Sequence, residues 1–139
     1  MKQYVIEIYR NSHAPLPYET NHQLTLTFSY WLLAPGEMAP REAADFAAET
    51  FCSELDVLED YRGDSEYGEE KFLAACTYHL LGNRRPTIGD VFHIAGPALD
   101  DHLWLALERR GWRTITSPTN VDGEPLTAAK VLRHLGIQR

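Results

Sequence analysis

The sequence predicts a single α+β domain over residues 1–139, with a mostly antiparallel sheet of about five strands, two central helices and a short C-terminal helix. Apolar residues alternate, as in strands, near the N-terminus and in the last third of the chain, and they follow a three-and-four spacing, as in helices, between those regions. A length of 139 residues suits one domain. Folding at this size buries roughly 68–70% of the surface of the unfolded chain, so one core is expected.

Two strands are predicted in the first third of the chain. Residues 3–9 are rich in β-branched and aromatic side chains, which favour strands. Residues 23–33 alternate as a half-buried strand does. The side chains expected on one face of that strand are Leu24, Leu26, Phe28, Tyr30 and Leu32. We expect the two strands to pair antiparallel across a connection longer than a tight hairpin.

Two helices are predicted in the middle of the chain. Pro35-Gly36 ends the second strand, and Pro40 suits the first turn of a helix that extends to Leu58. The residues that follow the three-and-four spacing of this helix are Ala43, Phe46, Ala47, Thr50, Phe51, Glu54 and Leu55, and Leu58 extends the apolar stripe. A second helix starts at about Ser65 or Glu69, runs to Leu81 and ends at Gly82. Its expected apolar face is Phe72, Cys76, His79 and Leu80.

The last third of the chain is predicted to form a three-stranded meander and a short helix. Residues 90–95 are typical of a strand between two glycines. Residues 101–109 fit both helical and strand spacing, and we favour the strand. A turn at Gly111 leads into a third strand at residues 112–116. The final helix, at about 125–135, is expected to dock on the sheet.

Charge is divided unevenly along the chain, whose net charge is −7. Residues 1–81 hold fourteen acidic and five basic side chains, whereas residues 82–139 hold six acidic and eight basic side chains. Eight of the acids lie between residues 54 and 70, where Arg62 is the only basic side chain. This acidic run predicts a surface that repels nucleic-acid phosphates and attracts basic partners.

The acidic run is the candidate partner-binding site, and the expected partner is a basic protein. Its two tyrosines would add contact area that charge alone does not supply. The expected contact residues are Glu54, Asp56, Glu59, Asp60, Tyr61, Asp64, Glu66, Tyr67, Glu69 and Glu70. The alternative interpretation is a solvated helix end and loop that keeps the protein soluble. The run lacks the residue order of a calcium-binding loop, so calcium binding is not predicted.

The apolar runs, the N-terminal residues and the cysteines bear on the cellular compartment and on cofactors. No apolar run approaches the roughly 20 residues that cross a bilayer, and an N-terminal strand containing Glu7 is unlike a signal peptide. Cys52 and Cys76 lie in helix-like apolar patterns, which are typical of buried thiols in a reducing cytoplasm. Cys76 and His79 lack the second ligand pair that would complete a metal site. We therefore expect a cytoplasmic protein without a metal or another cofactor, and the oligomeric state stays open.

A short pattern in the last third of the chain precedes two of the predicted strands. Its residues are Arg85, Gly89, Asp90, Gly111 and Trp112. In this pattern residues 84–116 resemble the small YodL-type proteins of bacteria and mobile elements, in which an arginine and a Ser-Leu-Ser-Val-Gly-Asp-Val-like stretch precede a strand. The chain departs from that stretch at Pro86-Thr87. The resemblance implies an accessory protein of a plasmid, phage or chromosomal island, and it supports the strand at residues 101–109.

The Gly-Asp pair also has a purely structural interpretation. Gly89 permits a turn conformation, and Asp90 can accept a hydrogen bond from a neighbouring backbone amide at a strand entrance. This interpretation needs no ligand, and we favour it for Trp112 as well.

Two further function classes stay open. A small enzyme or ligand-binding domain would have a pocket between the sheet and the helices, with His79, His93 or His102 near a carboxylate. Because the chain has no common catalytic motif, an enzyme is not favoured. Nucleic-acid binding would use a patch of Arg84, Arg85, Arg109, Arg110, Arg113 and Trp112. The acidic half of the chain argues against that class.

Overall fold

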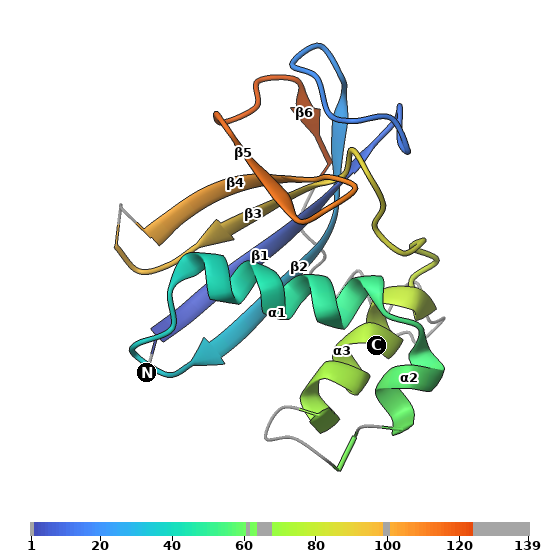
Figure 1. Cartoon of the computed structure of the whole chain (residues 1–139), viewed down its shortest axis with the longest axis vertical. Coiled ribbons are helices and arrows are strands. Elements are labelled where there is room, and N and C mark those ends of the chain that lie inside the picture. The colour runs from blue at the N-terminus through green and yellow to red at the C-terminus, as the bar shows by residue number, and fades with distance from the viewer. Residues whose placement is uncertain (1, 61, 64–67, 99–100, 124–139) are drawn as a thin grey trace, which may run out of the picture.

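The computed structural model describes residues 2–60, 62–63, 68–98 and 101–123, which form six strands and three helices (Figure 1). In chain order these are β1 (Lys2–Asn11), β2 (Leu24–Ala34), α1 (Pro40–Cys52), α2 (Leu55–Asp60), α3 (Gly68–Leu80), β3 (Val91–Ala95), β4 (His102–Leu107), β5 (Trp112–Ile115) and β6 (Val121–Asp122). The α+β class predicted from the sequence is confirmed. The helix predicted at about 125–135 lies outside the described residues.

The strands form one sheet in the order β5-β4-β3-β1-β2-β6. β1 pairs antiparallel with both β2 and β3, and β3, β4 and β5 form the predicted meander. Residues 102–107 are therefore a strand, and the helical alternative is wrong. The prediction of about five strands misses β6, which pairs parallel with Leu24 and Thr25 and makes the sheet mixed. Because β6 has only two residues, both exposed, its sequence has no alternation to detect.

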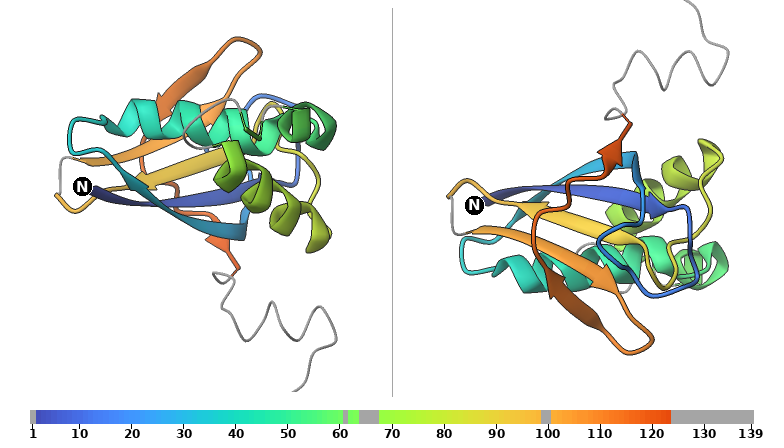
Figure 2. Two further views of the ribbon diagram at one scale, coloured as in Figure 1. Left: turned by 90° about the horizontal axis from the view of Figure 1, so that it is seen from below. Right: turned by 90° about the horizontal axis from the view of Figure 1, so that it is seen from above.

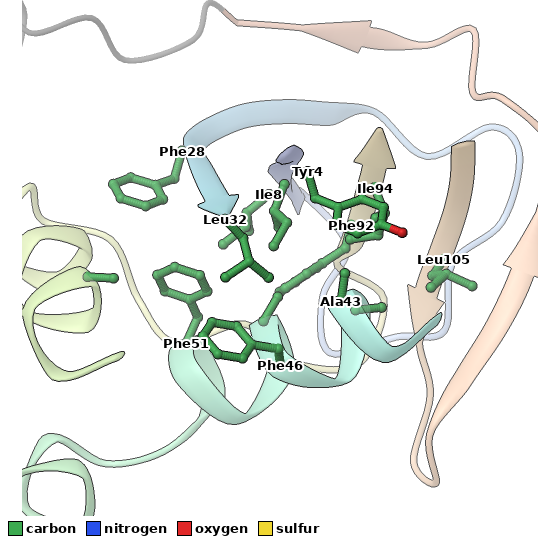
Figure 3. Packing of buried hydrophobic residues seen from close by; sticks show 14 of the residues in the cluster. Tyr4, Ile8, Phe28, Leu32, Ala43, Phe46, Phe51, Phe92, Ile94 and Leu105 are labelled. Atoms are coloured by element: carbon green, nitrogen blue, oxygen red, sulfur yellow. The ribbon is translucent and has the colours of Figure 1, made fainter. Parts of the chain in front are cut away.

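The main core lies between the helices and one face of the sheet. α1 crosses this face, and α3 packs against α1 and α2 (Figures 1 and 2). Figure 3 shows side chains of α1 and the sheet meeting there, and the rings of Phe51 and Phe28 are 5.5 Å apart between centroids. The ring of Tyr78 on α3 packs against both. Burial of these aromatic side chains supplies much of the driving force that holds the helices on the sheet.

A second cluster lies on the opposite face of the sheet. Ile8 belongs to the main core and its neighbour Tyr9 to the second cluster, so the two side chains point to opposite faces. A register shift between these residues inserts an additional residue into β2 between Leu26 and Phe28. The members of the second cluster are Tyr9, Tyr18, Leu24, Leu26, Val91 and Ala106. The prediction that Leu24 and Leu26 share a face with Phe28 is therefore wrong, because the bulge reverses the alternation.

The helical region also differs from the prediction in two respects. The first helix does not extend to Leu58, because the backbone at Ser53 is extended and separates α1 from α2. Three residues of low helix propensity lie at or just before this break: Thr50, Cys52 and Ser53. In α3 the buried residues are Gly68, Ala74, Ala75 and Tyr78 rather than the predicted face. The alanines allow close approach to α1, whereas Leu80 is 62% exposed.

Candidate functional site

The described residues of the predicted acidic run lie on α2, on α3 and in the segment between α1 and α2. We name its described carboxylates the acidic helical surface: Glu54, Asp56, Glu59, Asp60, Glu69 and Glu70, all of which are exposed. Three of them belong to α2 and two to the first turn of α3. A carboxylate in a first turn is favoured by the positive end of the helix dipole. Tyr61, Asp64, Glu66 and Tyr67, which the sequence also assigned to this site, lie outside the described residues.

Half of the acidic helical surface is engaged within the chain. Arg62 donates two hydrogen bonds to Glu69, of 2.8 and 2.7 Å, and this contact lowers the pKa of the Glu69 carboxyl. The hydroxyl of Tyr30 donates to Glu70 at 2.5 Å. The Arg85 guanidinium lies 3.8 Å from the carboxylate of Glu54. The charge of Glu69 is thus compensated in part, whereas the donor to Glu70 among the described residues is neutral.

The other half of the acidic helical surface has fewer contacts with the described residues, although Glu59 lies close enough to Arg62 for its charge to contribute to the raised pKa of that guanidinium. Among the described residues, none makes an ion pair or a side-chain hydrogen bond with Asp56, Glu59 or Asp60. All three side chains are exposed on α2, a helix with no basic residue in its last turn. Within the described part of residues 40–82 there are nine carboxylates and three basic side chains, a net charge of −6. The helical layer therefore carries most of the negative charge of the molecule.

An open groove of about 580 Å³ borders the acidic helical surface. It lies between β2 and α3 and is lined by Phe28, Tyr30, Glu69, Glu70, Leu73, Ala74 and Thr77. Burial, followed by the hydrogen bond to Glu70, raises the pKa of Tyr30, so its hydroxyl stays a donor. The side chain of Leu73 is 53% exposed there. Sequence reasoning missed this groove, since the helical spacing placed other residues of α3 on the contact face.

The Gly-Asp pair has the structural role that its sequence suggested. Asp90 is 1% exposed, and its carboxylate accepts hydrogen bonds from the backbone amides of Asn11 and Thr87, each at 2.9 Å. Arg84 adds two more, at 2.6 and 3.0 Å. These bonds tie the loop before β3 to the end of β1. The arginine that pairs with Asp90 is Arg84, whereas the exposed Arg85 of the family-like pattern does not reach it.

The second half of the family-like pattern is also structural. Gly111 has a φ of +78°, which favours glycine at the turn before β5. The ring of Trp112 packs against Phe92, with centroids 5.1 Å apart, and its indole N–H donates to Asp45 of α1 at 3.0 Å. Arg113 donates to the backbone carbonyl of Tyr18. Trp112 thus joins β5 to α1 instead of presenting a free ring, and this geometry does not favour nucleic-acid binding by stacking.

The histidines named for a ligand-binding pocket are divided between two places. His93 on β3 lies 2.8 Å from Glu7 through Nδ1 and 3.4 Å from His102 through Nε2. Its ring stacks on Trp104, on the sheet face away from α1. His79 of α3 lies beside the backbone carbonyl of Asn83 at 3.3 Å. None of them lines the groove between β2 and α3, so the combination expected of a catalytic pocket is not found there.

The two cysteines are free thiols, and both are partly buried. Burial raises the pKa of the Cys52 thiol to about 11, so this thiol is protonated at neutral pH. In the part of the chain that the structure describes, no three histidine, cysteine, aspartate or glutamate side chains are grouped so as to hold a metal ion. None of the described helices is both long enough and apolar enough to pass through a membrane.

Comparison with models of protein families, with curated proteins and with solved structures finds no significant match to this chain.

Proposed function

We propose that the chain is a small accessory protein that binds a basic protein partner through its acidic helical surface. The observation that carries this proposal is the group of three exposed carboxylates on α2 for which no described residue forms a salt bridge or a side-chain hydrogen bond: Asp56, Glu59 and Asp60. A surface of one sign raises the encounter rate with partners of the opposite sign and fixes their orientation. Because these side chains need no rearrangement to become accessible, they suit a first electrostatic contact.

We also propose that the protein acts in the cytoplasm. Free thiols persist in a reducing compartment, and the two cysteines of this chain form no disulfide in the structure. An accessory role agrees with what the resemblance of residues 84–116 to YodL-type proteins implies. Through such a role the protein would act by occupying the basic surface of its partner, including a surface that otherwise binds phosphates.

Affinity capture with a charge-reversed α2 tests the proposal. The variant Asp56→Lys/Glu59→Lys/Asp60→Lys removes the unpaired carboxylates and disturbs no described ion pair. A control, Glu19→Lys/Glu37→Lys/Asp122→Lys, changes the net charge equally at exposed acids elsewhere, and it also removes the contact of Glu19 with His22 and the hydrogen bond from Gln23 to Asp122. Both variants and the wild type are immobilised and exposed to native lysate at about 50 mM and about 300 mM NaCl. Retained proteins are identified by mass spectrometry, and circular dichroism verifies that each variant is folded.

We expect the wild type and the control to retain the same basic protein at low salt and to release it at the higher salt. The α2 variant should not retain it at either concentration, because electrostatic attraction has become repulsion. Recovery of the same partners by all three proteins at both salt concentrations contradicts the proposal.

A further inference from the structure

In the part of the chain that the structure describes, one edge of the sheet is open along most of β2. The strand runs from Leu24 to Ala34, and β6 pairs only with its first two residues. Gly123 follows β6 and lies against the backbone of Leu26. Of the described residues, none forms a strand beside the stretch from 27 to 34, and Figure 1 shows β2 at the border of the sheet. Every second residue there directs its N–H and C=O groups away from β1, as in any edge strand.

The open edge has apolar side chains on both faces. On the helical side, Phe28 and Tyr30 form one wall of the groove and Leu73 of α3 lies opposite. On the other side, Trp31 is 67% exposed and Leu33 is 54% exposed. A long apolar edge strand pairs readily with another extended chain, and natural proteins usually protect such an edge with charges, proline or a cover. The described part of β2 has no charged residue at all.

The negative charge beside the open edge of β2 favours one kind of binding partner over another. Glu70 lines the groove, and no described basic side chain pairs with it. The carboxylates of α2 lie on the helix that packs against α3. A second copy of this chain would bring a net charge of −7 and its own acidic helical surface to the same place. An extended segment with basic residues meets attraction instead of repulsion at this edge.

We propose that an extended basic segment of the partner adds to the outer edge of β2 as an additional strand, with alternate side chains entering the groove between β2 and α3. Main-chain hydrogen bonds to β2 supply affinity, and the side chains of alternate residues supply specificity. Apolar residues of the segment contact Leu73 on one face or Trp31 on the other, and a lysine or arginine reaches Glu70. This inference rests on the proposed function and specifies the form in which the partner binds.

A synthetic probe tests this mode of binding directly. The probe is a fluorescein-labelled octapeptide of alternating lysine and valine, and an octapeptide of alternating glutamate and valine is its control. Binding to the full chain is followed by fluorescence anisotropy. The variant Leu73→Arg places a positive charge in the groove, whereas Leu80→Arg changes another exposed leucine of α3, outside the groove. We expect the lysine peptide alone to bind, with about tenfold weaker affinity for Leu73→Arg and unchanged affinity for Leu80→Arg.

Hydrogen bonding between the peptide backbone and β2 is tested separately. Peptides N-methylated at every second residue lose donors on one edge only, so methylation in one phase should abolish binding and methylation in the other should not. Amide exchange of residues 27–34 should slow when the lysine peptide binds. Equal effects of the two leucine variants, or of the two methylation phases, overturn the inference. Within residues 27–34, only the amides that point away from β1 are informative, because the others already pair with β1. Protection of the outward amides without peptide also overturns the inference: if it is independent of concentration, the chain covers its own edge, and if it grows with concentration, a second copy does.

The inference and the proposed function can fail separately. Loss of the captured partner by the α2 variant together with retention by Leu73→Arg leaves the acidic surface as the binding site and overturns strand addition. Loss of the partner by Leu73→Arg together with retention by the α2 variant supports the groove and contradicts the role of α2. Loss in both variants, with retention by Leu80→Arg and by the Glu19/Glu37/Asp122 control, supports both.

Discussion

The turn at the entrance of β3 depends on specific contacts of two residues, Gly89 and Asp90. The Asp90 carboxylate is buried and accepts four hydrogen bonds, so its desolvation is offset by donors on both oxygen atoms. Gly89 beside it has a φ of +96° and its carbonyl accepts from the Asn11 side chain at 2.9 Å. A turn role for both residues was predictable from their types. The identity of Arg84 as the partner was not, because Arg84 and Arg85 are adjacent and equivalent by composition.

Alanine in place of Gly89 should destabilise the protein much more than alanine in place of Gly82. Both glycines have a positive φ, +96° and +84°. A Cβ at residue 89 would lie 2.1 Å from the carbonyl oxygen of Leu16, whereas a Cβ at residue 82 meets nothing within 4 Å. Backbone strain alone costs about 1 kcal/mol, and the steric conflict adds to it, so we expect losses of ~1 kcal/mol for Gly82→Ala and more than ~3 kcal/mol for Gly89→Ala.

Urea denaturation followed by circular dichroism measures both free energies of unfolding. Equal losses of unfolding free energy in the two variants would show that the loop containing Leu16 moves away from a Cβ at residue 89 without loss of stability. That result would contradict the predicted steric conflict.

At the scale of whole elements, Trp112 connects a strand of the meander to the helical layer. β5 is only four residues long and pairs with β4 alone. Trp112 makes an edge-to-face contact with Phe92 of β3, and its hydrogen bond to Asp45 attaches β5 to α1. Trp31 on β2 has no such role, since most of its ring is exposed. Residue type alone does not distinguish Trp112 from Trp31, but their contacts predict different contributions to stability.

Trp112→Ala should therefore lower the free energy of unfolding by about 2–3 kcal/mol, less than for a fully buried tryptophan because Trp112 is only partly buried. Trp31→Ala is the matched control and should leave stability nearly unchanged, while it weakens binding of the lysine peptide. Chemical denaturation measures the first effect and anisotropy the second. A destabilisation by Trp31→Ala as large as that by Trp112→Ala would contradict the assignment of these two side chains.

For the molecule as a whole, the dominant feature is the separation of charge between the helical layer and the C-terminal strands. The described helical layer has a net charge of −6, so its carboxylates repel one another in the folded state. Arg62 and Lys71 offset part of this repulsion through their contacts with Glu69 and Glu49. The remainder is concentrated on α2, which makes the fold sensitive to ionic strength.

Raising the NaCl concentration from about 20 mM to about 500 mM should increase the Tm of the wild type, because salt screens the repulsion among exposed carboxylates. The neutral variant Asp56→Asn/Glu59→Gln/Asp60→Asn should start from a higher Tm and respond less to salt. Thermal unfolding followed by circular dichroism measures both quantities, with Glu19→Gln/Glu37→Gln/Asp122→Asn as the control for acids elsewhere. If the Tm of the wild type and that of the α2 variant rise equally with salt, the repulsion among carboxylates that destabilises the fold lies outside α2.

The sequence by itself determined the α+β class, five of the strands, the start of α1 at Pro40, the turn role of Gly89 and Asp90, and the acidic character of the helical region. These features depend on local spacing, on residue type or on charge, each of which can be read within a few consecutive residues.

Only the tertiary structure decided the features that bear on binding. The bulge in β2 reverses the face of Leu24 and Leu26, and it arises from pairing with β1 rather than from a local signal. Packing against α1 selected the small residues of α3 for burial and left Leu73 exposed beside the β2 edge. The division of the carboxylates into paired and unpaired ones depends on side chains far apart in sequence, such as Tyr30 and Glu70. Contacts between distant segments leave no periodicity in the sequence, and for that reason the groove became visible only in the folded molecule.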